Sequence, residues 1–234
     1  MTKTLTEGNP AKLILFFSLP LIIGNIFQQF YSMADTLIVG RTIGVNALAA
    51  VGCTGSITFL ILGFVQGLTS GLSIITSQKF GANNEDAVRK SFAASILISS
   101  AVAIITTVFS VLLTRPLLEL LQTPAEIIDD ATAYLVIIFL GIPATILFNL
   151  LSNAVRALGD SKAPLYFLIF ACCVNIVLDL VFILYFHLGV AGAGIATILS
   201  QLLSGILCIF FIIKKVPILR LKKADFQIHY EVIA

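Results

Sequence analysis

Long apolar runs separated by short polar breaks dominate the sequence. Six runs are long enough to cross a bilayer, at residues 13–39, 47–77, 92–114, 132–155, 164–186 and 190–213. A membrane-spanning helix needs about 20 mainly apolar residues. We therefore predict an all-α integral membrane protein, a bundle of six transmembrane helices. The second run is longer than a bilayer requires, so its helix should tilt, bend or project from the membrane.

The distribution of Lys and Arg predicts how the bundle is oriented. With a cytoplasmic N-terminus and alternating sides, the inner segments hold 12 of the 14 basic residues, and the outer segments hold only Arg41 and Arg115. Basic residues favour the cytoplasmic loops of membrane proteins. Both termini should therefore lie in the cytoplasm, and residues 214–234 should form a basic cytoplasmic segment after a domain of residues 1–213.

Composition supports this prediction and narrows the partners. Hydrophobic residues make up 59% of the chain and charged residues 11%, whereas a soluble domain carries about 25% charged residues. The net charge is only +2, which argues against nucleic acid and leaves the lipid bilayer as the expected partner. The four cysteines lie in apolar runs without metal-binding spacing, so we interpret them as packing residues.

Prolines and small residues inside the runs predict local features of the helices. Pro20 and Pro143 each remove a backbone hydrogen bond, and the resulting bend can be either a hinge or a static kink. The second and sixth runs are rich in Gly, Ala and Ser. Such residues let membrane helices approach closely, so we expect both runs to pack against neighbouring helices.

Asp35 and Asp179 are the only acidic residues within the six runs. A charged aspartate at the centre of a membrane helix costs about 2.5–3.5 kcal/mol on insertion scales, and such residues are functional by default. Two other interpretations remain open. Asp35 can sit at the outer interface, and both aspartates can serve only helix association.

Counting along the helices brings several polar residues to one depth. Asp179 lies about 12 Å from the outer end of the fifth helix, and Thr197 about 10 Å from the outer end of the sixth. Asp35 occupies the outer half of the first helix. Asn175 lies one turn below Asp179, and Gln28 shares a face with Asp35. We expect these oxygen-bearing groups to converge in the outer leaflet.

The converging groups predict a site for a small cation or a proton. Carboxylate, amide and hydroxyl oxygens suit a hard cation such as Na⁺. Two carboxylates in a low-dielectric site can instead hold a proton, because burial and mutual repulsion disfavour two charges. The residues alone do not choose between Na⁺ and H⁺.

Several motifs occur in a fixed order along nearly the whole chain. They are Pro20, Ala34-Asp35-Thr36-Leu37-Ile38-Val39-Gly40, Ser77-Gln78-Lys79-Phe80-Gly81-Ala82, Gly141-Ile142-Pro143, Arg156-Ala157-Leu158-Gly159-Asp160-Ser161-Lys162-Ala163-Pro164, Asn175-Ile176-Val177-Leu178-Asp179 and Gly192-Ala193-Gly194-Ile195-Ala196-Thr197. In this order they resemble the N-terminal six-helix lobe of the multidrug and toxic compound extrusion (MATE) family of transporters.

The resemblance implies a function and a set of site residues. It implies a non-enzymatic H⁺- or Na⁺-coupled antiporter that exports amphipathic, often cationic, drugs across the cytoplasmic membrane of a bacterium, with no cofactor besides the coupling ion. The residues that match the family's coupling site are Asp35, Asn175, Asp179 and Thr197, with Tyr134 as an associated tyrosine. By the same resemblance, Gln28 and Asn149 would line the drug cavity.

The chain departs from the family in its length. MATE transporters have twelve helices in two lobes, whereas this chain predicts one lobe of six. Because six helices return the chain to the cytoplasm, a second lobe could follow in the same orientation as a parallel repeat. We expect a fragment or truncated gene product whose missing second lobe belongs to the same chain. A half-transporter that forms a homodimer is the less favoured alternative.

Three other functions were weighed against export. A lipid-linked sugar flippase of the same wider group would place basic residues inside its spans, and none is predicted there. An intramembrane serine protease needs a Gly-x-Ser-Gly nucleophile, and the spacing in Gly67-Leu68-Thr69-Ser70-Gly71 is wrong. A non-transporting structural subunit needs no buried carboxylates, because Asn or Thr would associate helices at lower cost.

Overall fold

The computed structural model describes residues 10–221 and 225, and these are almost entirely helical. The helices are α1 (Pro10–Thr42), α2 (Val45–Gly81), α3 (Glu85–Leu120), α4 (Ile128–Leu140), α5 (Ile142–Ala157), α6 (Lys162–Leu180) and α7 (Gly189–Lys215). A π-helical turn, Val181–Tyr185, extends α6, and a 3₁₀ turn, η2 (Pro217–Leu219), follows α7. No strand occurs in the described residues, which confirms the predicted all-α class.

The helices match the six predicted spans when α4 and α5 are counted together. Five helices are long and apolar enough to cross a membrane, and α4 and α5 form a sixth span bent by 45°. Most helices extend a few residues beyond the apolar runs, and α3 does so most, from Glu85 to Leu120 around the run 92–114. Its 36 residues span about 54 Å, so α3 projects past the ~30 Å hydrocarbon core.

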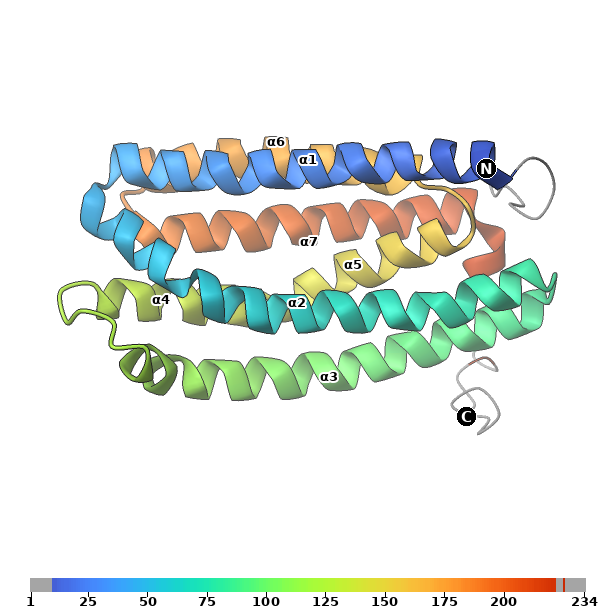
Figure 1. The fold of residues 1–234 in the computed structure, drawn as a ribbon, viewed down its shortest axis with the longest axis horizontal. Coiled ribbons are helices and arrows are strands. Elements are labelled where there is room, and N and C mark those ends of the chain that lie inside the picture. The colour runs from blue at the N-terminus through green and yellow to red at the C-terminus, as the bar shows by residue number, and fades with distance from the viewer. Residues whose placement is uncertain (1–9, 222–224, 226–234) are drawn as a thin grey trace.

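α1, α6 and α7 pack together in one part of the bundle, and α2 and α3 pack together in another. In Figure 1, α1 and α6 lie side by side, α7 lies next to them, and α5 connects to this layer from the side of α2 and α3. α5 packs against both α2 and α7, whereas α1 has few contacts with α2. α1 begins at the same end of the bundle at which α7 ends (Figure 1), as an even number of crossings requires.

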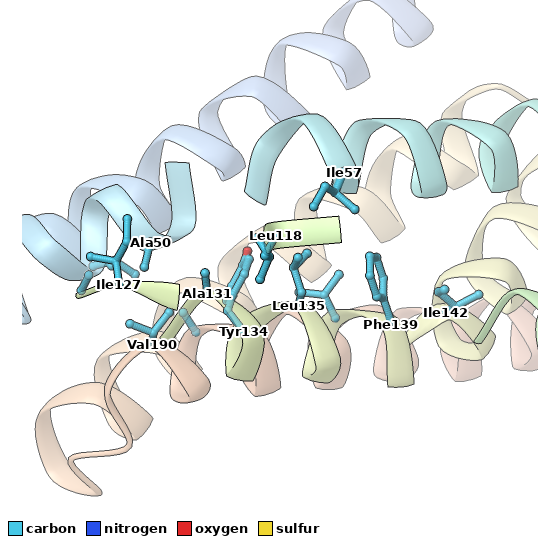
Figure 2. Close-up of a cluster of buried hydrophobic side chains, with 14 of the residues drawn as sticks. Ala50, Ile57, Leu118, Ile127, Ala131, Tyr134, Leu135, Phe139, Ile142 and Val190 are labelled. Carbon is cyan, nitrogen blue, oxygen red and sulfur yellow. The ribbon is translucent and has the colours of Figure 1, made fainter. Parts of the chain in front are cut away.

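Two hydrophobic clusters, one toward each end of the bundle, hold the helices together. The first lies at the end that we predict to be extracellular, where α4 packs against α2, α3 and α7. Figure 2 shows Tyr134, Leu135 and Phe139 of α4 within this cluster, with Ile57 of α2 opposite them. The second cluster joins α3, α5, α7 and η2 at the predicted cytoplasmic end. Together the clusters fix α4, α5 and α7 relative to one another.

Both helices rich in small residues pack against neighbours, as predicted, but α7 does so through its glycines and α2 does not. A Cβ at Gly194 would lie 2.9 Å from Cγ2 of Ile137, so only glycine allows α4 to approach α7 so closely there. Five glycines of α2 (Gly52, Gly55, Gly63, Gly67 and Gly71) have no such neighbour within 4 Å in the described structure. Among the described residues, these five glycines of α2 therefore contact no neighbouring helix.

The two interior prolines have different surroundings. Pro143 lies in the first turn of α5, directly after the 45° bend at Gly141, so a static kink exists at this position. Pro20 lies inside the continuous helix α1 and is buried. Movement about either proline stays a prediction.

The predicted basic segment at 214–234 is only partly described. α7 continues to Lys215, and η2 then folds back against α3. Residues 222–224 and 226–234 lie outside the described residues.

The prediction that no basic side chain lies within a span needs a correction. Arg156 belongs to the last turn of α5 and is half-buried, and its guanidinium donates a hydrogen bond of 3.3 Å to Asn153. The hydropathy pattern assigned Arg156 to a polar break, because an Arg near a helix end lowers the local hydropathy as a loop residue does. The guanidinium reaches back along the helix instead.

Candidate functional site

The side chains of Asp35 and Asp179 meet across the contact between α1 and α6. Asp179 is fully buried, and Asp35 is 7% exposed. The two carboxyl groups lie close enough together for the charge of each to act on the other. The structure thus places in contact the two aspartates that the sequence assigned only to the same depth.

Neutral polar groups of α6 and α7 extend the site. Asn175, one turn from Asp179, donates a 3.4 Å hydrogen bond to the hydroxyl of Thr197. Ser200, which is fully buried, donates a 2.8 Å hydrogen bond to the backbone carbonyl of Thr197. Amide and hydroxyl oxygens therefore lie beside the carboxylate pair, as the depth argument predicted.

Two tyrosines complete the surroundings of the carboxylates. Tyr134 of α4 is buried within electrostatic reach of Asp35 and Asp179, and its role at the site stays a prediction. Tyr31 of α1 lies beside Thr197 and Ser200 and was missed by the sequence reasoning. Its spacing was informative, because Tyr31 precedes Asp35 by four residues and so shares its face of the helix.

The site lies at one depth, about 10 Å below the outer ends of its helices. Asp35 is seven residues before the end of α1, and Asp179 is six residues before the end of the π-helical turn, roughly 9–10 Å in each case. Thr197 is eight residues, or about 12 Å, after the start of α7. π-Helical turns often occur at functional sites, and this one begins two residues after Asp179.

The site concentrates buried polar atoms that lack a donor or acceptor partner. Within the described structure these atoms are Oδ1 of Asp35, both carboxyl oxygens of Asp179, Oδ1 of Asn175 and the hydroxyl of Tyr31. A buried polar atom without a partner costs about 1–3 kcal/mol, and more if it is charged. The cost falls if a cation or a proton occupies the space between these oxygens.

The carboxylate pair has no basic partner to neutralise it. Among the described residues, no Lys, Arg or His forms an ion pair with Asp35 or Asp179; the ion pairs lie instead at the helix ends, around Arg89 and Arg115. No three His, Cys, Asp or Glu side chains cluster in that part of the chain. A cation at this site would therefore have two carboxylates and neutral oxygens as ligands.

The two predicted cavity residues lie apart from the carboxylate cluster. Gln28 is exposed on α1, a little less than one turn before Tyr31 and about two turns before Asp35. Asn149 is half-buried on α5, whose polar residue Thr145 donates a 2.6 Å hydrogen bond to Gln201 of α7. A substrate-binding role for Gln28 and Asn149 stays a prediction.

Comparison with known proteins shows that most of the chain is similar to transporters. The family model described as MatE matches residues 20–181. A probable multidrug resistance protein of Bacillus subtilis, YpnP, is 36% identical over 209 residues, which are 89% of this chain and 47% of the relative. The multidrug export protein MepA of Staphylococcus saprophyticus is 26% identical over 211 residues, covering 88% of this chain and 46% of the relative.

A solved structure has the same fold as this chain. It is described as the outward-facing conformation of a multidrug resistance MATE family transporter. Its TM-score is 0.90 at 25% sequence identity, and the match covers 100% of this chain but 52% of that chain. The chain thus spans about half the length of the relatives that it matches.

Proposed function

Because the chain belongs to the MatE family, we propose that it is the N-terminal six-helix lobe of an antiporter that exports amphipathic, often cationic, compounds. The antiporter exchanges them for H⁺ or Na⁺ entering a bacterial cell across the cytoplasmic membrane. Members of this family are transporters rather than enzymes, and the apolar helices make this chain a multi-pass membrane protein.

The observation that carries the proposal is the contact between Asp35 and Asp179 in the outer half of the lobe. Two buried carboxylates without a basic partner cannot both stay charged at low cost. A proton or Na⁺ from outside removes this cost and stabilises a lobe in which α1, α6 and α7 are tightly packed. Binding of the ion thus shifts the lobe between two shapes.

Direct contact between the carboxyl groups favours a proton over Na⁺. Two neighbouring buried carboxyl groups without other partners can share one proton, with the remaining charge spread over both. Na⁺ would have to lie between the carboxylates and draw further oxygens from Asn175 and Thr197. Movement of α1 near Pro20, and of the α4–α5 bend near Pro143, would then carry the change to the drug cavity that Gln28 and Asn149 line.

A second six-helix unit is the proposed partner of the lobe. The open face of α2 carries glycines and the exposed polar residues Ser56, Gln66 and Ser70, a composition poorly suited to contact with lipid tails. A second lobe, in the same chain or in a homodimer partner, would line a cleft with this face. The matched relatives are about twice as long as this chain, which agrees with a partner in the same chain.

Proteoliposomes test the coupling. The complete two-lobed transporter is reconstituted, and uptake of a fluorescent cationic dye is followed while a gradient of either H⁺ or Na⁺ is imposed. We expect dye movement against its own gradient when the proton gradient is opposed to it, and loss of this movement in Asp35→Asn. Equal dye movement with and without any ion gradient would overturn antiport, and movement driven by Na⁺ alone would overturn the preference for H⁺.

A further inference from the structure

A groove on the outside of the lobe, away from the carboxylate site, has no assigned role. It has a volume of about 600 Å³ and lies between α3, α5 and α7. Its walls are almost entirely apolar, and they include Ile104 and Ile213, which are 67% and 52% exposed. One end of the groove lies at the bend between α4 and α5, where α5 turns away from the axis of α4 near Pro143.

The groove spans one leaflet of the membrane. Along α3 it runs from Ile104 to Phe92, which is about 18 Å. Half of the ~30 Å hydrocarbon core is about 15 Å. The deep end lies at Pro143, in the middle of the α4–α5 span, and the other end lies at Arg220, beyond the cytoplasmic end of α7.

A single cation lies at the cytoplasmic mouth of the groove. η2 folds back against α3 and places Leu219 and Leu221 in the groove wall, with Arg220 between them. Arg220 donates its Nε–H to the carbonyl of Ile213, at 2.8 Å, which fixes the guanidinium at the mouth. Its other N–H groups have no partner among the described residues, and no acidic side chain lines the groove.

A buried hydroxyl inside the groove also lacks a partner. Ser99 lines the groove, is 1% exposed, and its Oγ makes no hydrogen bond within the described part of the chain. It lies near the deep end, one turn from Ala103. The groove is therefore about as long as one leaflet of the hydrocarbon core is thick. Its wall is apolar, and a cation lies at its cytoplasmic end.

We propose that this groove is a binding site for one anionic phospholipid of the inner leaflet. One acyl chain lies along α3 and α5 towards Pro143, and the phosphate group accepts hydrogen bonds from Arg220. Basic residues at the cytoplasmic ends of membrane helices attract anionic lipid headgroups. The proposal does not depend on export or on the coupling ion, because the groove shares no residue with the Asp35–Asp179 site.

Native mass spectrometry of the purified 234-residue chain tests the site with phosphatidylglycerol and phosphatidylcholine as probes. We expect one retained phosphatidylglycerol, bound about fivefold more weakly in Arg220→Gln, since one basic residue near the surface contributes about that factor. Binding of phosphatidylcholine should not change. Lys214→Gln is the matched control, because Lys214 is exposed at the same end and does not line the groove.

A second pair of variants separates the groove from general lipid contact. Ser100→Phe fills the groove from an exposed position on α3, and it should remove the retained lipid whatever its headgroup. Ala101→Phe adds the same ring at the neighbouring exposed position outside the groove and should leave binding unchanged. Equal binding by the two phenylalanine variants, or equal weakening by Arg220→Gln and Lys214→Gln, would overturn the proposal.

Discussion

Replacing Asp179 with asparagine in the complete transporter should abolish drug resistance at normal expression. Asparagine keeps the size of the side chain and removes its capacity to bind a proton or to balance a cation. The variant should lose the whole coupling between ion and drug binding. Between linked sites, one ligand typically changes the affinity for the other by about 5–150-fold. The measurement is the drug concentration that stops growth of cells carrying each variant, with the amount of protein in the membrane checked in parallel.

The same substitution should not destabilise the lobe. Asp179 is fully buried and its two oxygens have no partner in the described structure, so the carboxylate is costly to the fold. A neutral amide avoids that cost, and the thermal unfolding temperature should stay equal or rise. Loss of transport without loss of stability distinguishes a coupling site from a purely structural role. A structural subunit would show the reverse.

Asp130→Asn provides the matched control. Asp130 lies exposed in the first turn of α4, on the same side of the membrane as Asp179 in the predicted topology. Its replacement makes the same chemical change outside the bundle and should leave resistance at the wild-type level. Resistance that persists in Asp179→Asn, or that falls equally in both variants, would contradict the proposed coupling site.

Hydropathy and charge predicted the number of spans because both depend on the bilayer rather than on tertiary contacts. Six runs and a common depth for Asp35 and Asp179 could be counted along the chain. The helix ends could not, because hydropathy falls where a helix leaves the lipid while its hydrogen bonds continue. α3 illustrates this, since Glu85 to Ser91 are helical yet carry four charged side chains.

The site was predicted less completely than the fold, for a different reason. Asp35, Asn175, Asp179 and Thr197 stand out because polar groups are rare in spans. Tyr31 does not stand out, because a tyrosine near a helix end also suits the membrane interface. The partner of the α2 glycines was not predictable for a third reason. Small residues indicate a close partner, but a sequence does not say whether that partner lies within the same six helices.

Gly141→Ala should produce the largest loss of stability of any single-methyl change at the described glycines. A Cβ at Gly141 would lie 2.7 Å from Cδ1 of Ile198 and 3.1 Å from the carbonyl oxygen of Ile138. The backbone there, at φ −81° and ψ −5°, suits alanine, so the whole effect is one of space. Overpacking of this kind costs about 1–3 kcal/mol, which corresponds to a fall of roughly 2–12 °C in the unfolding temperature.

The chain carries its own probes for this measurement. Cys172 and Cys208 are buried and free, so a thiol-reactive fluorescent dye reports their exposure as the lobe unfolds. Gly67→Ala is the control, because no side-chain or neighbouring backbone atom lies within 4 Å of an added Cβ in the middle of α2. It should be neutral or slightly stabilising, since alanine is the better helix former by about 1 kcal/mol.

Rescue by a second substitution identifies the neighbour that causes the loss. Ile198→Ala removes the atoms that the new methyl group would meet, so the pair Gly141→Ala and Ile198→Ala should lose less stability than the sum of the single changes. Simple additivity would show that Ile198 moves aside freely and that the α4–α5 bend tolerates a wider contact with α7. If the pair is rescued in stability but the complete transporter that carries it still fails to export, transport needs Ile198 itself or the close approach of the bend to α7, beyond its contribution to packing.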